Sequence, residues 1–349
     1  MIQCSECHTV CTGTDWHCTC GSPVEVVDDS EFDVEKLEKV CSLWRYKKYL
    51  GVGNRVSFNE GMTPVVFVDD CYYKLDYLFP TNSFKDRGST VMMSYLDTQK
   101  IKTVVEDSSG NAGASVAAYA ALAGITAEIY VPDYASQGKI SQIAACGAKI
   151  VRVEGTREDT RKKAVKRAQK VYYASHQWNP YFLEGMKTVA YELAEQFGWD
   201  VPTVVIPVGS GSLYYGVYKG FNHLVESGVI DEIPYLVGVQ AEVFSPVYAA
   251  VNNSEPRKEK SIAEGLLVEE PPRLKEIVKV VKKYGDIITV SEEEIRIGLK
   301  KALHMGLYIE PTSAVVVAAL DKMPSSEKVV GVLTGSGLKA THEIRQLLE

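Results

Sequence analysis

Short β-branched segments alternate with segments of helical spacing along most of the chain. Each β-branched segment has the length of a strand, and the stretch that follows it repeats apolar residues every three or four positions. Strands that alternate with helices favour parallel sheets, so the pattern predicts an α/β fold. The predicted strands are 103–106, 127–131, 149–153, 203–208, 236–240, 287–290 and 329–333.

The first third of the chain has a different pattern. Residues 33–46 carry apolar side chains at helical spacing and predict one amphipathic helix. Residues 65–68 and 72–75 read as the two strands of a hairpin, and the alternation of residues 71–77 fits a strand. Helical spacing resumes after residue 88.

Length and charge narrow the class of protein. The 349 residues are 46% hydrophobic, enough for two domains with buried cores. The net charge of −7 is spread along the chain, which argues against nucleic acid or an anionic membrane as a partner. No apolar run approaches the roughly 20 residues that span a bilayer, and the first residues lack a signal-peptide layout. We expect a cytoplasmic protein.

Five of the eight cysteines lie in the first twenty residues, which favours a metal site over disulfides. A C-x-x-C pair and a C-x-C pair are separated by a short polar segment, the layout of a zinc ribbon. Residues 1–35 contain no Lys or Arg, so a structural role for the ribbon fits better than phosphate binding. A metal-free ribbon is the alternative. The predicted ligands are Cys4, Cys7, Cys18 and Cys20, with Cys11, His8 or His17 as substitutes for one of them.

Lys85 lies between the strand-like residues 71–77 and the helical residues after 88. A lysine at such a strand-to-helix junction can face a cleft and act as a Schiff-base nucleophile. The alternative is a solvated lysine in a charged turn beside Asp86 and Arg87.

Three further loops follow predicted strands and precede helices or turns. Residues 108–113, Ser-Ser-Gly-Asn-Ala-Gly, form an anion site in which free N–H groups favour a carboxylate. Residues 207–213, Pro-Val-Gly-Ser-Gly-Ser-Leu, have the form of a phosphate cup, but lack the dinucleotide fingerprint and the lysine of a P-loop. A monophosphate fits best there. Residues 334–339 are Thr-Gly-Ser-Gly-Leu-Lys. Taken alone, the first loop and Thr334 would be ordinary helix caps.

Residues 83–88, Ser-Phe-Lys-Asp-Arg-Gly, resemble the lysine motif of the fold-type II pyridoxal-phosphate enzymes, and their wording is most similar to the threonine synthases. The glycine loops, the E-G-x-T-P run at residues 60–64, the T-G-x-G-L-K run and the cysteines match that family in its chain order. The resemblance covers nearly the whole chain. It implies pyridoxal 5'-phosphate as cofactor, possible structural zinc, and a homodimer.

The resemblance also implies roles for single residues. Lys85 would hold the cofactor and move protons at the substrate Cα and Cβ, and Thr334 would face the pyridine nitrogen. The residues implied to bind the cofactor are Lys85, Asn111, Gly209, Ser210, Gly211, Ser212, Leu213 and Thr334, and those implied to bind the substrate are Ser109, Gly110, Asn111 and Ala112.

The implied organisation is a zinc-ribbon-like segment (1–26), a large domain that binds the cofactor (27–88 and 185–349) and a small α/β domain (89–184). The implied reaction converts O-phospho-L-homoserine and water into L-threonine and phosphate. Many family members have an arginine that holds the substrate phosphate at the position of Phe182. Because phenylalanine cannot pair with a dianion, either Arg87 or Lys187 replaces that arginine, or the substrate differs.

Two alternatives therefore stay open. One is a related enzyme that catalyses β-elimination or β-replacement on threonine, serine or O-phosphoserine, as dehydratases and cysteine or cysteate synthases do. The other is a ribbon-containing binding or regulatory protein that has kept the fold and lost the chemistry, although the joint presence of Lys85, Asn111, the Gly209 loop and Thr334 argues against it.

Overall fold

The computed structural model describes residues 1–28, 30–53, 55–135, 137–324 and 328–348. The chain divides into two compact units, each of which is described by itself. Unit 1 comprises Met1–Ser30, Lys36–Gly61 and Lys85–Met186, and unit 2 comprises Glu31–Glu35, Met62–Phe84 and Lys187–Glu349.

A small antiparallel sheet begins unit 1. Its described strands are β1 (Ile2–Cys4), β2 (Val10–Cys11) and β3 (Val24–Val26), in the order β2-β1-β3. The aromatic ring of Trp16, between β2 and β3, packs edge-on against Tyr173 and Trp178 of the larger sheet region, at centroid distances of 5.0 and 5.2 Å. The cysteine-rich segment is therefore anchored on unit 1 by aromatic packing.

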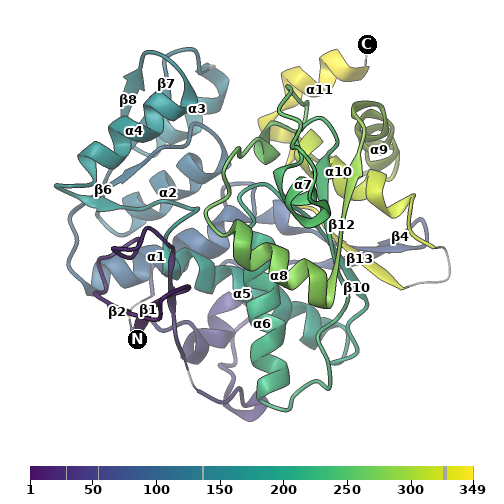
Figure 1. Ribbon diagram of the computed structural model, residues 1–349, viewed down its shortest axis with the longest axis horizontal. Helices are drawn as coiled ribbons and strands as arrows, with labels where there is room; N and C mark the ends of the chain where they lie inside the picture. Colours follow the sequence, from purple (N-terminus) through teal and green to yellow (C-terminus); the bar gives the residue numbers. More distant parts are fainter. Residues whose placement is uncertain (29, 54, 136, 325–327, 349) are drawn as a thin grey trace. The chain divides into compact units, whose positions relative to one another are not determined.

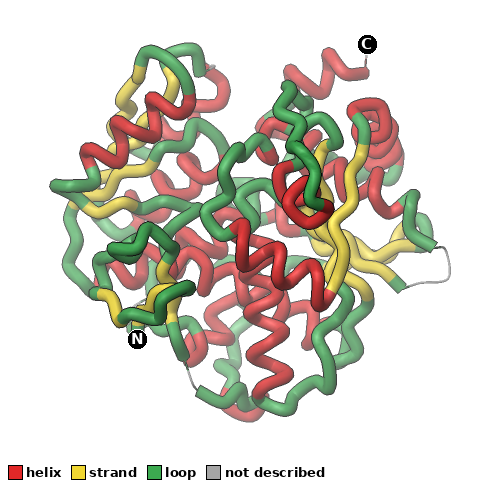
Figure 2. Tube along the Cα trace, in the orientation of Figure 1, coloured by secondary structure: helices red, strands yellow, loops and turns green. Residues whose placement is uncertain are grey.

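The larger sheet of unit 1 is parallel throughout the described residues, in the order β8-β7-β6-β9. Helices separate its strands along the chain, as Figure 2 shows in red and yellow. The strands are β6 (Thr103–Glu106), β7 (Thr126–Pro132), β8 (Lys149–Val153) and β9 (Tyr172–Tyr173), and the helices are α1 (Lys85–Thr98), α2 (Asn111–Leu122), α3 (Gln137–Ala145) and α4 (Arg157–Arg167). Helix α5 (Pro180–Gln196) begins in unit 1 and ends in unit 2.

The described part of unit 2 contains a six-stranded sheet in the order β12-β11-β10-β13-β5-β4. Only the pairing of the predicted hairpin, β4 with β5, is antiparallel. The strands are β4 (Val65–Val68), β5 (Cys71–Lys74), β10 (Thr203–Pro207), β11 (Leu236–Ala241), β12 (Gly285–Val290) and β13 (Val329–Val332).

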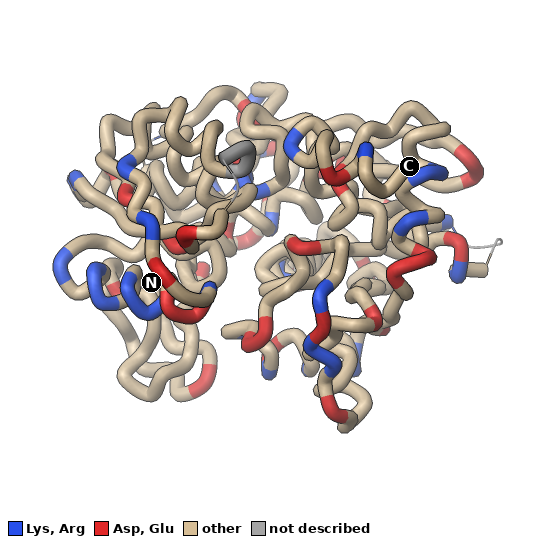
Figure 3. Tube along the Cα trace, turned by 90° about the horizontal axis from the view of Figure 1, so that it is seen from above, with Lys and Arg blue, Asp and Glu red and all other residues tan. Residues whose placement is uncertain are grey.

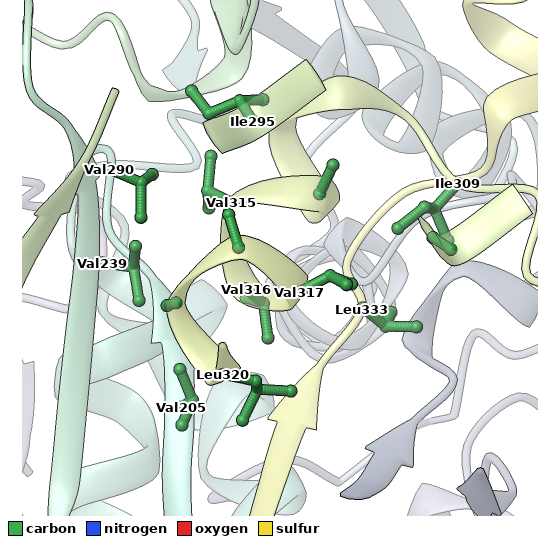
Figure 4. Packing of buried hydrophobic residues seen from close by; sticks show 14 of the residues in the cluster. Val205, Val239, Val290, Ile295, Ile309, Val315, Val316, Val317, Leu320 and Leu333 are labelled. Atoms are coloured by element: carbon green, nitrogen blue, oxygen red, sulfur yellow. The ribbon is translucent and has the colours of Figure 1, made fainter. Parts of the chain in front are cut away.

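Helices cover both faces of this sheet. Val237 and Val239 of β11 belong to the same buried cluster as residues of α10, and Figure 4 labels Val239 together with Val315 and Val316 of that helix. A Cβ on Gly238, between the two valines, would lie 3.5 Å from Tyr214 of α6; both helices are labelled in Figure 1. Successive strand residues face opposite sides, so α10 and α6 lie on opposite faces. The helices of unit 2 are α6 (Ser212–Glu226), α7 (Pro246–Asn252), α8 (Leu274–Tyr284), α9 (Glu292–His304), α10 (Pro311–Leu320) and α11 (Thr341–Leu348).

All seven strands predicted from residue 103 onward are present, with ends that differ by at most two residues. The single helix predicted for residues 33–46 is wrong. Two 3-10 segments, Val34–Lys36 and Leu43–Tyr49, occupy this region. The Glu38 N–H donates to the Arg45 carbonyl at 3.0 Å, and the Ser42 side chain caps the second segment. The backbone thus bonds across a turn rather than to the residue four positions earlier, although Leu37 and Leu43 are still buried.

Lys and Arg are interspersed with Asp and Glu along the trace, as the blue and red segments of Figure 3 show. Among the described residues, no helix is both long enough and apolar enough to cross a membrane.

Candidate active site

Lys85 is the first residue of α1, as the strand-to-helix pattern predicts, and it is the residue at which the sequence passes from unit 2 to unit 1. After β5, the chain returns to the end of β13: the Phe84 N–H donates to the Thr334 carbonyl at 2.9 Å, and Ser83 forms a β-bridge with Gly335. Lys85 itself is half-buried, and its Nζ lies 5.9 Å from the centroid of the Phe182 ring. Covalent continuity therefore ties the lysine closely to the Thr334 loop.

The predicted substrate loop lies in unit 1, between β6 and α2. Gly110 is the residue before α2, and Asn111 opens the helix, so the loop lies at a helix N-terminus, the position that favours an anion. The turn is tight, because a Cβ on Gly113 would lie 1.9 Å from the Ser108 carbonyl oxygen. Ser109, Gly110 and Asn111 are half-exposed, while Ala112 is buried.

Two acids precede this loop, the buried Glu106 and the partly exposed Asp107, and the sequence analysis missed them. The fully buried Glu106 ends β6, and one of its carboxyl oxygens shares a hydrogen bond of 2.7 Å with Nδ1 of His176. Burial raises the pKa of Glu106 to about 8, while the Lys85 charge and hydrogen bonding from His176 act in the opposite direction. Burial likewise raises the pKa of Asp107 to about 6, and the Tyr173 hydroxyl donates to it at 2.8 Å.

The predicted phosphate loop lies in unit 2, between β10 and α6. Gly211 precedes α6 in the left-handed conformation, with φ of +79°, and Ser212 opens the helix. A Cβ on Gly209 would lie 2.9 Å from the Gly265 carbonyl oxygen. The hydroxyls of Ser210 and Ser212 are 3.2 Å apart. Bare backbone, two hydroxyls and a helix N-terminus form a cradle that suits a monophosphate.

Thr334 follows β13 and is buried. Its hydroxyl lies 3.1 Å from that of Ser313, which also accepts hydrogen bonds from the N–H groups of Thr334 and Gly335 at 3.0 and 2.8 Å. The sequence analysis named no role for Ser313. The only sequence signal was the E-P-T-S-A run at residues 310–314. The position of this run in the chain does not show that Ser313 contacts the Thr334 loop.

Three of these features meet at one edge of the sheet in unit 2. Strands β10, β13 and β5 are neighbours and run parallel, so their carboxyl ends point the same way. These ends lead to the Gly209 loop, to Thr334 and to the turn before Lys85, respectively. Ligands of open α/β sheets bind outside the carboxyl ends of the strands.

Phe182, at the position where the family resemblance implies an arginine, is fully buried in α5. It packs against α1 so closely that a Cβ on Gly88 would lie 2.5 Å from its ring. Its ring is 6.2 Å from that of His176. Two cations proposed as substitutes are also buried, Arg87 fully and Lys187 to within 4% exposure.

The four predicted cysteine ligands come together. The sulfur atoms of Cys4, Cys7, Cys18 and Cys20 all lie within 4.8 Å of one another, and the Cys4–Cys20 and Cys7–Cys18 separations are 3.5 and 3.6 Å. Four thiolates at 2.3 Å from a tetrahedral zinc ion would be about 3.8 Å apart, so the set fits zinc. Within the described residues, Cys11 and the histidines do not join this group.

Comparison with known proteins identifies the family of this chain. The model of the family described as "Pyridoxal-phosphate dependent enzyme" matches residues 56–335. A threonine synthase of Methanocaldococcus jannaschii is 31% identical over 92% of this chain and 88% of its own. A threonine synthase of Methanosarcina acetivorans is 31% identical over 95% of this chain and 89% of its own.

Solved structures agree on the fold. Diaminopropionate ammonia lyase from Escherichia coli superposes with a TM-score of 0.74 at 18% identity, covering 92% of this chain and 96% of that one. Threonine deaminase isoform 2 from Solanum lycopersicum gives 0.72 at 21% identity, covering 93% and 96%. With the family model and the long curated relatives, these matches show that the chain belongs to the fold-type II pyridoxal-phosphate-dependent enzymes, in the threonine synthase family.

Proposed function

We propose that this protein is a threonine synthase that converts O-phospho-L-homoserine and water into L-threonine and phosphate. The observation that carries the proposal is the shared carboxyl edge of β10, β13 and β5, which serves the Gly209 loop, Thr334 and the approach to Lys85. Curated relatives that this chain matches over most of both sequences are named threonine synthase.

Each group of site residues has a separate role in the proposed reaction. Gly209–Leu213 would hold the cofactor phosphate, and Lys85 would hold its aldehyde carbon. Pyridoxal phosphate, when bound, supplies an electron sink for negative charge at the substrate Cα. Lys85, as a neutral amine, would take the proton from Cα and return protons at Cα and Cβ. The loop Ser109–Ala112 would bind the substrate carboxylate through its N–H groups. Thr334 would offer the cofactor ring a neutral hydroxyl rather than a charge.

Phe182 favours a second candidate, an enzyme that eliminates or replaces the β-substituent of threonine, serine or O-phosphoserine. A buried phenyl ring gives a phosphate dianion no charge-assisted hydrogen bond. The acids Glu106, which is buried, and Asp107, which is partly exposed, also lie in unit 1 and would repel a dianion whenever they are ionised.

Product analysis separates the two. The protein loaded with pyridoxal phosphate is offered O-phospho-L-homoserine, O-phosphoserine, threonine and serine in parallel. We expect threonine and phosphate from phosphohomoserine alone. Lys85→Ala should lower kcat by about 10³-fold or more, because no other group supplies the amine. Lys163→Ala, an exposed lysine of α4, should change nothing. Ketoacid from threonine or serine would replace the proposed reaction with the second candidate.

We also propose that Cys4, Cys7, Cys18 and Cys20 hold a structural zinc ion. Elemental analysis should find about one zinc per chain. Cys18→Ser should lose the metal, because its sulfur belongs to the four-sulfur group, whereas Cys41→Ser should keep it, because Cys41 lies outside. Full zinc content in Cys18→Ser, or loss of zinc only in Cys11→Ser, would contradict this ligand set.

A further inference from the structure

The cysteine-rich segment makes an aromatic contact that the roles proposed above do not use. The Trp16 ring lies edge-on against the rings of Tyr173 and Trp178, at centroid distances of 5.0 and 5.2 Å. Trp16 packs there against a buried cluster that contains Val105 of β6 and Tyr173 of β9. Two residues further along the chain, Cys18 is one of the four proposed zinc ligands. The aromatic contact therefore begins directly beside the proposed metal site.

The same segment also contacts α1. A Cβ on Gly13 would lie 1.8 Å from the hydroxyl oxygen of Tyr95, so the backbone passes close to that side chain. The Tyr95 ring stacks on the ring of Tyr181 in the first turn of α5, with centroids 3.6 Å apart. Because Gly13 and Trp16 are three residues apart, the two contacts hold one short stretch, residues 12–17, between β2 and Cys18.

Tyr173 extends this contact to the loop that is proposed to bind the substrate. Its hydroxyl donates to Oδ1 of Asp107 at 2.8 Å. Burial raises the pKa of Tyr173 well above its usual value, so the phenol keeps the proton that it donates. Asp107 directly follows β6 and stands two residues before Ser109, where the loop Ser109–Ala112 begins. Tyr173 thus contacts the ribbon with its ring and the base of the loop with its hydroxyl.

The chain between Asp107 and α2 is tightly packed. The Gly110 N–H donates to the Ser108 hydroxyl at 3.3 Å, and a Cβ on Gly113 would lie 1.9 Å from the Ser108 carbonyl oxygen. A displacement of Asp107 is therefore passed on to the N-terminus of α2, because the turn has no room to absorb it.

We propose that Trp16 is a positioning residue through which the zinc ribbon holds the loop Ser109–Ala112 in the conformation that binds the substrate carboxylate. This inference rests on the roles proposed above for that loop and for the four cysteines. The cysteines, drawn together on one ion, fix residues 12–17, Trp16 supports Tyr173, and Tyr173 holds Asp107. Without this support the loop adopts the binding conformation for a smaller fraction of the time, and the apparent affinity for the substrate falls by that fraction.

A purely structural anchor is the alternative role for Trp16. A partly buried tryptophan between two aromatic rings stabilises unit 1 whether or not it affects the loop. The two roles differ at one atom. Tyr173→Phe keeps the ring that packs on Trp16 and removes the hydroxyl that bonds to Asp107.

Hydrogen exchange, measured by mass spectrometry on protein that carries zinc and pyridoxal phosphate, tests the proposal. In Tyr173→Phe, the amides of residues 108–112 should exchange about threefold to tenfold faster, as expected from the loss of one hydrogen bond. Trp16→Ala, or removal of zinc with a chelator, should give a similar increase. Removal of zinc from Tyr173→Phe should add nothing, because the connection to the loop is already broken.

Controls separate this effect from a general loss of stability. Tyr130 of β7 packs against the same cluster as Trp16, and Tyr130→Phe leaves the Tyr173–Asp107 bond in place, so loop exchange should not change. Val10→Ala alters a side chain of the ribbon that is 62% exposed, and it should also have no effect. The amides of residues 209–213, in unit 2, should exchange at the natural rate in every variant.

Three results would overturn the proposal. One is natural exchange of residues 108–112 in Tyr173→Phe. Another is an equal increase in residues 209–213, which would indicate a general loss of stability. The third is a further increase when zinc is removed from Tyr173→Phe, because the ribbon would then act by another route. If Trp16→Ala does not fold, Tyr173→Phe and the removal of zinc still decide.

Steady-state kinetics distinguish positioning from a part in the chemistry. On whichever substrate proves active, Tyr173→Phe should raise KM about threefold to tenfold and leave kcat within about twofold, because only binding is weakened. A lower kcat at an unchanged KM would contradict the proposal. If phosphohomoserine is not a substrate, the proposed function fails, but hydrogen exchange still decides the role of Trp16.

Discussion

The two glycine loops of the molecule share a strand–loop–helix plan and differ in what surrounds them. The loop of unit 2 follows the buried apolar end of β10 and is bare backbone with serine hydroxyls. The loop of unit 1 follows two acids whose pKa is raised, Glu106 and Asp107. A phosphate dianion is bound best where no negative charge opposes it, whereas acids whose pKa is raised by burial can stay neutral beside a lysine.

The two loops show that a helix N-terminus by itself explains only a preference for a negatively charged ligand. The residues before the loop decide which other chemistry accompanies it. In unit 1 these residues are ionisable, and in unit 2 they are apolar. The first loop thus suits proton transfer, and the second suits a permanent anchor.

The largest effect on stability should come from adding a side chain within the tight turn of the unit 1 loop. In Gly113→Ala the new Cβ meets the Ser108 carbonyl oxygen at 1.9 Å, so the backbone must move. We expect the free energy of unfolding to fall by about 3 kcal/mol. Gly110→Ala is the control, because its Cβ meets only the Ser108 hydroxyl, at 4.0 Å. Urea denaturation of both variants measures the difference, and equal losses would show that the turn is not tight.

In unit 2, Ser313→Ala should lower the stability of the loop that contains Thr334 and Gly335. The change leaves the buried N–H groups of Thr334 and Gly335 without their acceptor. We expect a loss of about 2 kcal/mol in denaturant unfolding and a weaker hold on the cofactor. Ser245→Ala removes one longer hydrogen bond, at 3.3 Å to Glu242, and should cost less than half as much. A Ser313→Ala variant as stable as the natural protein would mean that the N–H groups find other partners.

The smallest effect should be the pH dependence of stability at Glu106. Its pKa is about 8 in the folded chain and near 4.5 when unfolded, so the unfolded chain releases this proton first. Stability contributed by the neutral acid is therefore lost as pH rises from about 4.5 to 8, and Glu106→Gln avoids the loss. We expect the variant to gain about 1.4 kcal/mol or more over the natural chain by about pH 9, measured by thermal unfolding. A constant difference between pH 5 and 9 would contradict the raised pKa.

Local patterns predicted much of the fold because they reflect local physics. The strands from residue 103 onward and the β4–β5 hairpin follow from β-branched runs bounded by turns. The helix predicted for residues 33–46 is wrong because the Glu38 N–H bonds to the Arg45 carbonyl and the Ser42 side chain accepts from the Trp44 N–H. The spacing of apolar residues does not show which groups the backbone bonds to.

The sequence alone determined the fold class, the family and the four cysteines, because each rests on short motifs whose spacing sets their geometry. The roles proposed for Lys85, Asn111 and Thr334 stay predictions. Only the tertiary structure revealed the contacts of Ser313 with Thr334 and of Glu106 with His176. These contacts join residues far apart in the chain, and the pKa of a buried acid depends on burial and neighbouring charges that no local pattern contains.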